Sequence, residues 1–134
     1  MFGPDAAPCS LLQLLMENLS PHDFARDWID AFNAHDIERI MAHYAPDVEL
    51  TSPLYLKFTE GRTDRLQNRQ TLRAYFEAAL KRYPRMRLTL HEVAAGTHSV
   101  CIRYHTSLGS RIAIECFERA PDGQVTRVTC HYVS

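Results

Sequence analysis

Glu115 is the residue whose chemistry differs most clearly from that of its surroundings. It is the single charged residue in the segment Ile-Ala-Ile-Glu-Cys-Phe, residues 112–117, which is typical of a β-strand. Alternation along a strand places Glu115 on the same face as Ala113 and Phe117. A carboxylate buried among such neighbours takes up a proton or finds a hydrogen-bond donor, and such groups are frequent at binding and catalytic sites. We therefore predict a raised pKa for Glu115 and a role as acid or hydrogen-bond donor. The alternative is a structural carboxyl that accepts a hydrogen bond from Tyr104 or an arginine.

The other reactive side chains show no arrangement that indicates a known chemistry. The seven histidines contain no HExxH motif and no tight pair on one helix face, so we expect neither a metal nor a cofactor. They are His22, His35, His43, His91, His98, His105 and His131. The four cysteines have no CxxC spacing, which favours reduced thiols in a cytoplasmic protein. They are Cys9, Cys101, Cys116 and Cys130. No GxSxG motif is present, so nucleophilic catalysis has little support.

Length and charge indicate one domain with no nucleic-acid or membrane partner. The 134 residues are 46% hydrophobic, which is enough for one core. Basic and acidic residues balance at 15 and 16, without a basic block. Residues 1–19 are interpreted as an extension, either a short helix or a disordered arm, with a start at Met16 as an alternative. The domain itself is expected over residues 20–134.

The elements that position Glu115 are expected in the order α-α-β-α-β-β-β-β. Ser20 and Pro21 begin a helix that ends near residues 34–35. A second helix runs from Asp36 to Pro46, a strand covers residues 47–51, and a loop covers 53–67. Asn68 caps a third helix that Pro84 ends. Four strands of an antiparallel meander follow, at residues 86–90, 100–104, 113–117 and 128–132.

Turn chemistry predicts the register of the last three strands. Gly109 and Ser110 suit a two-residue turn, which would place Tyr104 opposite Glu115. A four-residue loop at 120–123 would align Glu115 with Val128. The core-facing set is then Val100, Ile102, Tyr104, Thr106, Ala113, Glu115, Phe117, Val128, Cys130 and Tyr132.

The opposite sheet face has an apolar centre and a charged margin. Its residues include Cys101, Arg103, Ile112, Ile114 and Cys116. A face of this composition is suited to a subunit interface, and we expect a homodimer through it.

Several segments together resemble the SnoaL-like domain of the nuclear-transport-factor-2-like superfamily. They are Trp-Ile-Asp-Ala-Phe-Asn-Ala-His-Asp at 28–36, Ala-His-Tyr-Ala-Pro-Asp-Val-Glu-Leu-Thr-Ser-Pro at 42–53, Leu-Arg-Ala-Tyr-Phe at 72–76, Ile-Glu-Cys-Phe at 114–117 and Asp-Gly-Gln-Val at 122–125. The resemblance covers roughly residues 21–133 and implies a cone-shaped α+β barrel, a curved antiparallel sheet wrapped around three helices. This fold hosts ketosteroid isomerases, polyketide cyclases and non-enzymatic binders.

The resemblance to ketosteroid isomerase carries over only in part. The base of that family, an Asp before a Pro, falls on Ser52, and its oxyanion Tyr falls on Trp28. Its second acid is retained as Glu115. Because serine is not a useful base near neutral pH, the steroid isomerase mechanism is not expected. Trp28 is expected as a second donor beside the neutral acid.

The fold implies a pocket for a small apolar ligand, which contains Trp28, Ser52 and Glu115 and has an apolar lining. We expect the lining to include Phe32, Tyr55, Phe58, Phe76, Leu88, Ile102, Tyr104, Phe117, Val128, Cys130 and Tyr132. The loop 53–67 would be a lid or a packed loop. The expected function is an isomerase or cyclase of a small carbonyl compound. The alternatives are a ligand-binding module and a dimeric interaction domain.

Four arginines could bind an acidic ligand at the pocket mouth, although a solvated face is favoured. They are Arg62, Arg65, Arg69 and Arg73.

Overall fold

The computed structural model describes residues 19–109 and 111–133. Its helices are α2 (Pro21–Asn33), α3 (Ile37–Met41), α4 (Pro53–Phe58) and α5 (Arg69–Arg82). Its strands are β1 (Tyr44–Thr51), β2 (Arg65–Gln67), β3 (Leu88–Ala95), β4 (Ser99–Thr106), β5 (Ile112–Arg119) and β6 (Val125–Tyr132). The α+β class is therefore confirmed. Nearly all of the N-terminal extension lies outside the described residues.

Among the described residues, no helix has both the length and the apolar character needed to span a membrane.

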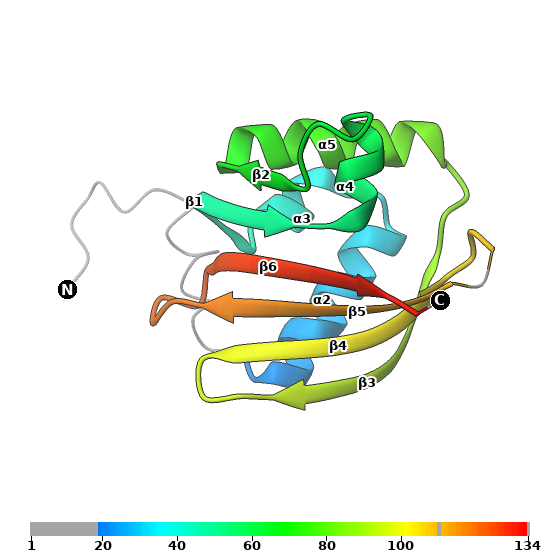
Figure 1. Ribbon diagram of the computed structural model, residues 1–134. Helices are drawn as coiled ribbons and strands as arrows, with labels where there is room; N and C mark the ends of the chain where they lie inside the picture. Colours follow the sequence, from blue (N-terminus) through cyan, green and yellow to red (C-terminus); the bar gives the residue numbers. More distant parts are fainter. Residues whose placement is uncertain (1–18, 110, 134) are drawn as a thin grey trace.

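The six strands form one curved sheet in the order β2-β1-β6-β5-β4-β3 (Figure 1). All neighbouring strands are antiparallel except β1 and β6, which run parallel. The prediction of a purely antiparallel sheet was wrong at this pair. A parallel neighbour requires a long crossover connection, and the chain from α4 through β5 supplies it.

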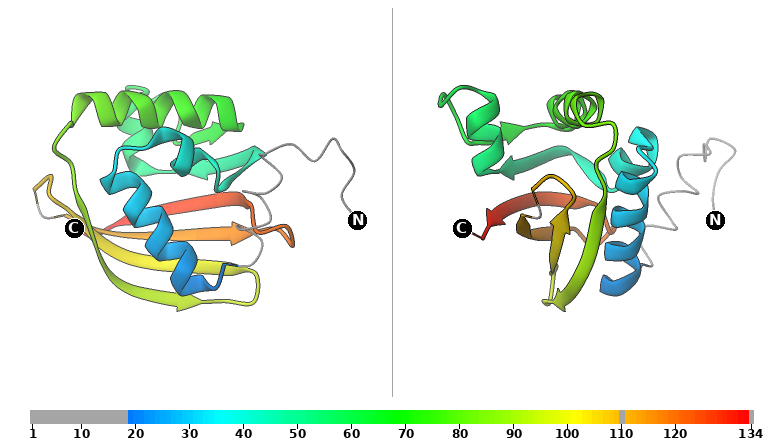
Figure 2. Two further views of the ribbon diagram at one scale, coloured as in Figure 1. Left: turned by 180° about the vertical axis from the view of Figure 1, so that it is seen from behind. Right: turned by 90° about the vertical axis from the view of Figure 1, so that its right-hand side faces the viewer.

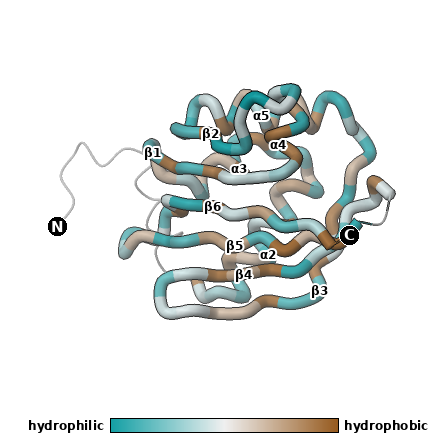
Figure 3. Tube along the Cα trace, in the orientation of Figure 1, coloured by the Kyte–Doolittle hydropathy of each residue, from teal (hydrophilic) through white to brown (hydrophobic). Residues whose placement is uncertain are grey.

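Helix α2 lies across the concave face of the sheet, while α5 covers β1 (Figure 2). Ser20 caps α2 by accepting from the Asp23 N–H at 3.1 Å. The buried face of α2 places Phe24 and Trp28 edge-on against Phe117 of β5. Apolar residues also follow the central strands β4 and β5 (Figure 3). The core thus lies between α2 and the middle of the sheet.

The segments before and after Ser52 both differ from their predictions. Strand β1 begins at Tyr44 and includes Pro46, so the second helix ends earlier, at Met41. The segment predicted as a loop contains helix α4 and strand β2, and Leu66 of β2 pairs with Leu50. Helix α4 forms because Ser52 caps its first turn, and β2 forms because β1 offers it a free edge.

Both predicted hairpin registers are displaced by two residues. Glu115 lies opposite Ile102 rather than Tyr104, and opposite Cys130 rather than Val128. The β4–β5 connection is longer than two residues, because the Thr106 N–H still bonds to the Arg111 carbonyl at 3.2 Å. A shift by an even number leaves each side chain on its face, so Glu115 still points toward the core.

Cys101 and Cys116 form a disulfide between β4 and β5, which corrects the prediction of reduced thiols for these two residues. Cys130 is a free thiol, as predicted, and Cys9 lies outside the described residues. The two residues are directly paired across the strands, with Cα atoms 4.1 Å apart. The sequence did not reveal this pairing, because the cysteines are 15 residues apart and only the sheet register brings them together. The disulfide also removes the support that cysteine usage provided for a cytoplasmic location.

We predict that peptide mapping without reduction recovers a cross-linked peptide containing Cys101 and Cys116. Treatment with a thiol reductant should release both halves, and Cys116→Ser should abolish the species. Complete alkylation of both cysteines in unreduced, denatured protein would contradict the assignment.

Candidate functional site

A cavity of about 330 Å³ opens at one end of the sheet. The α5–β3 connection, the β4–β5 turn and the end of β6 come together at this end (Figure 1). This volume is at the lower end of the range for small-molecule sites. The lining is mainly aromatic and aliphatic. It consists of Trp28, Phe32, Leu50, Ser52, Leu54, Tyr75, Phe76, Tyr83, Met86, Leu88, Tyr104, Thr106, Leu108, Arg111, Glu115, Cys130 and Tyr132.

Glu115 is the one carboxyl among these lining residues, and its side chain is 5% exposed. The Tyr104 hydroxyl donates to its Oε1 at 2.6 Å. Loss of hydration raises the pKa of Glu115 from 4.5 to about 7, although the hydrogen bonds from Tyr104 and Cys130 act in the opposite direction. The direction agrees with the expectation from sequence. Glu115 therefore exists in both protonation states near neutral pH.

Cys130 and Ser52 form the polar side of the cavity next to Glu115. Cys130 lies directly opposite Glu115 in the sheet. Burial raises the pKa of Cys130 well above its ordinary value, so the sulfur stays protonated. Ser52 lines the cavity together with Cys130 and Tyr132, and its hydroxyl accepts from the Leu54 N–H at 3.1 Å. Ser52 thus links the cavity to the start of α4.

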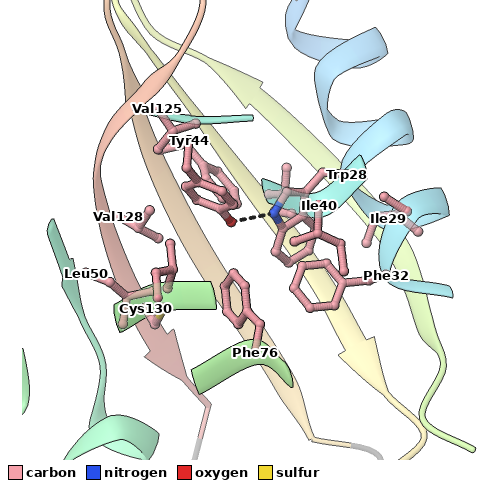
Figure 4. Close-up of a cluster of buried hydrophobic side chains, with 14 of the residues drawn as sticks. Trp28, Ile29, Phe32, Ile40, Tyr44, Leu50, Phe76, Val125, Val128 and Cys130 are labelled. Atoms are coloured by element: carbon pink, nitrogen blue, oxygen red, sulfur yellow. Dashed lines mark hydrogen bonds between the residues drawn. The ribbon is translucent and has the colours of Figure 1, made fainter. Parts of the chain in front are cut away.

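Trp28 is in the cavity wall, but its indole N–H is not available to a ligand. It donates to the Tyr44 hydroxyl at 2.8 Å, inside the core (Figure 4). The prediction of Trp28 as a second donor was wrong, because Tyr44 belongs to β1 rather than to the preceding helix. Trp28 therefore offers the cavity its ring surface, which also contacts Phe32 and Tyr104.

Some of the expected pocket residues line the cavity and others do not. Those that line it are Phe32, Phe76, Leu88, Tyr104, Cys130 and Tyr132, together with Trp28, Ser52 and Glu115. Those outside it are Tyr55, Phe58, Ile102, Phe117 and Val128. The last three are completely covered by the core.

Tyr55 and Phe58 lie on α4 and pack with Tyr75 of α5 rather than entering the cavity. The ring centroid of Tyr75 lies 5.0 Å from that of Tyr55 and 5.1 Å from that of Phe58. From α4, only Leu54 lines the cavity. The helix therefore forms a packed aromatic wall beside the cavity.

The cavity mouth contains residues that sequence reasoning missed. Tyr83 and Leu108 are each more than 40% exposed and lie beside Met86. The connection that carries Met86 is held by the side chains of Asn33 and His35, which bond to the backbone of Leu88 and Met86. A connection between elements has no sequence periodicity. The sequence therefore could not predict that this connection lines the cavity, and the hydrogen bonds from Asn33 and His35 determine its position.

Arg111 is another missed residue of the mouth, and here a signal was present. Arg111 directly precedes β5, and the alternation of residues 111, 113 and 115 places it on the face of Glu115. By contrast, the four arginines considered from sequence do not line the cavity, and Arg73 pairs with Glu38 and Glu77.

Within the described ranges, no three side chains of His, Cys, Asp or Glu are grouped as metal ligands would be. The buried His43 instead bonds to Asp27, with Nε2 to Oδ2 at 2.7 Å. Arg39 holds the other oxygen of Asp27 at 2.8 Å. This cluster ties α2 to α3 and to the start of β1, away from the cavity.

The site can thus bind an apolar molecule and move one proton at Glu115. The hydroxyls of the half-buried Tyr75 and Tyr132 remain neutral donors, because partial burial raises the pKa of each above its ordinary value. Among the lining residues no second carboxyl and no histidine is present, so proton transfer through a pair of acids has no support.

Comparisons with known proteins agree with this architecture. The family model for the SnoaL-like domain matches residues 25–133. A SnoaL-like protein of unknown function from Burkholderia thailandensis is 35% identical, with a TM-score of 0.80 over 85% of this chain and 95% of that chain. No curated protein matches the chain.

More distant structures share the fold alone. A protein from Kribbella flavida proposed to be a ketosteroid isomerase is 21% identical, with a TM-score of 0.65 over 92% of this chain and 79% of that chain. IdmH from Streptomyces antibioticus, a proposed polyketide cyclase, is 16% identical, with a TM-score of 0.71 over 85% of this chain and 92% of that chain.

Proposed function

Since the chain belongs to the family of SnoaL-like domains, we propose that it is an isomerase-type or cyclase-type enzyme acting on a small apolar carbonyl compound. In this proposal Glu115 is the one group that transfers a proton. The ionised carboxylate removes a proton from the carbon next to the carbonyl, and the resulting acid returns it to the same molecule at another atom. The proton count of the protein is unchanged over the cycle.

The observation that carries the proposal is the buried Glu115 carboxyl with a pKa of about 7. A group that titrates near the working pH is an effective general base and general acid in turn. An ordinary glutamate is almost fully ionised at neutral pH and is a poor acid there. The Tyr132 hydroxyl, which lines the same cavity, can donate to the oxygen of the enolate.

Ser52, which the family resemblance places at the base position, is better suited to support than to catalysis. Its hydroxyl caps α4, and the residue lines the cavity together with Cys130 and Tyr132. We therefore keep Ser52 as a positioning residue and retain Glu115 as the sole acid–base group.

The test is hydrogen exchange into a simple ketone, 2-nonanone, in D₂O, followed by proton NMR. We predict that the protein accelerates exchange beside the carbonyl, because deuterium from the solvent replaces the abstracted proton on Glu115 before the acid returns it to the carbon. Glu115→Gln should lower the protein-dependent rate at least tenfold, as loss of a general base does by a factor of about 10²–10⁴. The rate should rise with pH through a midpoint of about 7, because the ionised form is the base. Glu118→Gln, on the exposed side of the same strand, is the matched control.

Exchange that is equally fast in Glu115→Gln would contradict the proposal. The runner-up is a ligand-binding module, and it is favoured by the bond from Tyr104 that already occupies Glu115 Oε1. Binding of 2-nonanone without any acceleration of exchange would identify that case.

We also propose that two copies associate through the outer sheet face around the half-buried Ile112 and Ile114. Light scattering at micromolar concentration should give the mass of a dimer, and Ile114→Glu should give that of a monomer, because it places an unpaired charge at the centre of the contact. Ala78→Glu, at an exposed position of α5, is the control. A monomeric wild-type protein, or a dimer that tolerates Ile114→Glu, would contradict this interface.

A further inference from the structure

Arg111 is the one cationic side chain among the lining residues of the cavity. It is exposed and directly precedes β5, two positions before Ala113 and four before Glu115. Because alternate residues of a strand share a face, this spacing aligns Arg111 and Glu115 along one wall. At about 3.3 Å per residue, their Cα atoms are about 13 Å apart, one deep in the cavity and one at its mouth.

The guanidinium of Arg111 makes no ion pair with any described residue. Its contact is with the ring of Tyr132, whose centroid lies 5.9 Å from the guanidinium carbon. Two arginines of the sheet are paired: Arg103 bonds to Glu92 at 2.8 Å, and Arg127 lies near Glu49 and Glu118. The stacked ring keeps Arg111 beside the opening with its donor groups uncommitted to described carboxylates.

We propose that the ligand of this cavity is an amphiphilic keto acid, whose carbonyl lies near Glu115 and whose carboxylate binds Arg111 at the mouth. This inference rests on the proposed function and adds the substrate class. The planar guanidinium suits a carboxylate, because two parallel hydrogen bonds can form between them. Apolar residues of the same lining, among them Phe76, Leu88 and Leu108, suit an aliphatic or aromatic linking chain.

Charge favours the same orientation. Glu115 carries a partial negative charge near neutral pH, so a ligand carboxylate avoids the deep end of the cavity. The lining of the mouth contains no described carboxylate. Two further cationic residues, the exposed Arg85 and Arg87, flank the lining residue Met86 in the chain. An anion is therefore attracted to the opening and repelled from the buried acid.

A matched pair of probes tests this: 8-oxononanoate and its methyl ester, with binding measured by calorimetry. The wild-type protein should bind the acid about two- to fivefold more tightly than the ester, as one partly exposed ion pair provides. Arg111→Gln should remove the preference, and Arg111→Lys should retain part of it. Arg26→Gln removes one charge on the exposed face of α2 and should leave the preference unchanged. The preference should also weaken at higher ionic strength.

Equal affinity of the wild-type protein for acid and ester, or a preference that survives Arg111→Gln, overturns the keto-acid assignment. These outcomes are separable from failure of the proposed function. If the ester binds and exchanges its protons through Glu115 without preference for the acid, only the substrate class is wrong. If both probes bind with the expected preference but Glu115→Gln leaves exchange unchanged, Arg111 binds the anion as proposed and the catalytic role is wrong. If neither probe binds, both are overturned.

Discussion

Glu115→Gln is expected to stabilise the folded chain by about 3 kcal/mol at pH 8 and to change its stability little at pH 4. The folded-state pKa of Glu115 is about 7, against 4.5 for the free side chain. A carboxyl with a raised pKa stabilises the fold fully below the unfolded-state value, and this contribution is lost as the pH rises through the folded-state value. A difference of about 2.5 pKa units corresponds to about 3 kcal/mol, and glutamine resembles the neutral acid at every pH.

Urea unfolding of wild-type and variant proteins between pH 4 and pH 8 measures this difference. Glu118→Gln is the control, since Glu118 is exposed and its ion pair with Arg127 is long, at 3.9 Å. Parallel stability curves for the wild type and Glu115→Gln would show that Glu115 is not desolvated. A stability gain combined with loss of ketone exchange would mean that the buried carboxyl is kept for function at the expense of stability.

Asp27→Asn is expected to destabilise the fold by about 2 kcal/mol at neutral pH. Hydrogen bonds from His43 and Arg39 hold the pKa of Asp27 at about 2, against an ordinary value of 3.8, although partial burial acts in the opposite direction. A lowered pKa contributes stability that is complete above pH 3.8 and is lost as the pH falls through about 2. The difference of about 1.8 pKa units corresponds to about 2 kcal/mol.

Unfolding in urea at pH 7 and at pH 2 checks the effect, which should shrink as Asp27 of the wild type takes up a proton. Asp30→Asn is the control, because Asp30 is exposed on the same helix and its side chain makes no hydrogen bond with the described residues. An Asp27→Asn protein as stable as the wild type at pH 7 would mean that the link from α2 to His43 contributes nothing.

The sequence by itself determined which faces the side chains of the central strands occupy. Strand periodicity is two, so an error of two residues in either hairpin register moved the partners of Glu115 but not its face. The buried carboxyl, its raised pKa and its bond with Tyr104 were predictable for this reason. Ser20, Asp36 and Asn68 act through local bonds, which explains why the helix starts also followed from sequence.

Only the tertiary structure decided the contacts between segments that are far apart in the chain. The parallel pairing of β1 with β6, the disulfide between Cys101 and Cys116, and the bond from Trp28 to Tyr44 each depend on how whole elements pack. The cavity mouth is the clearest case, because one connection and one turn form it together. The backbone of Arg87 bonds twice to Ser107, and Asn33 holds Leu88 from α2. Local patterns show the period of an element but not which distant segment lies beside it. Alternation places Arg111 on the face of Glu115, but its position at the opening depends on how distant segments pack.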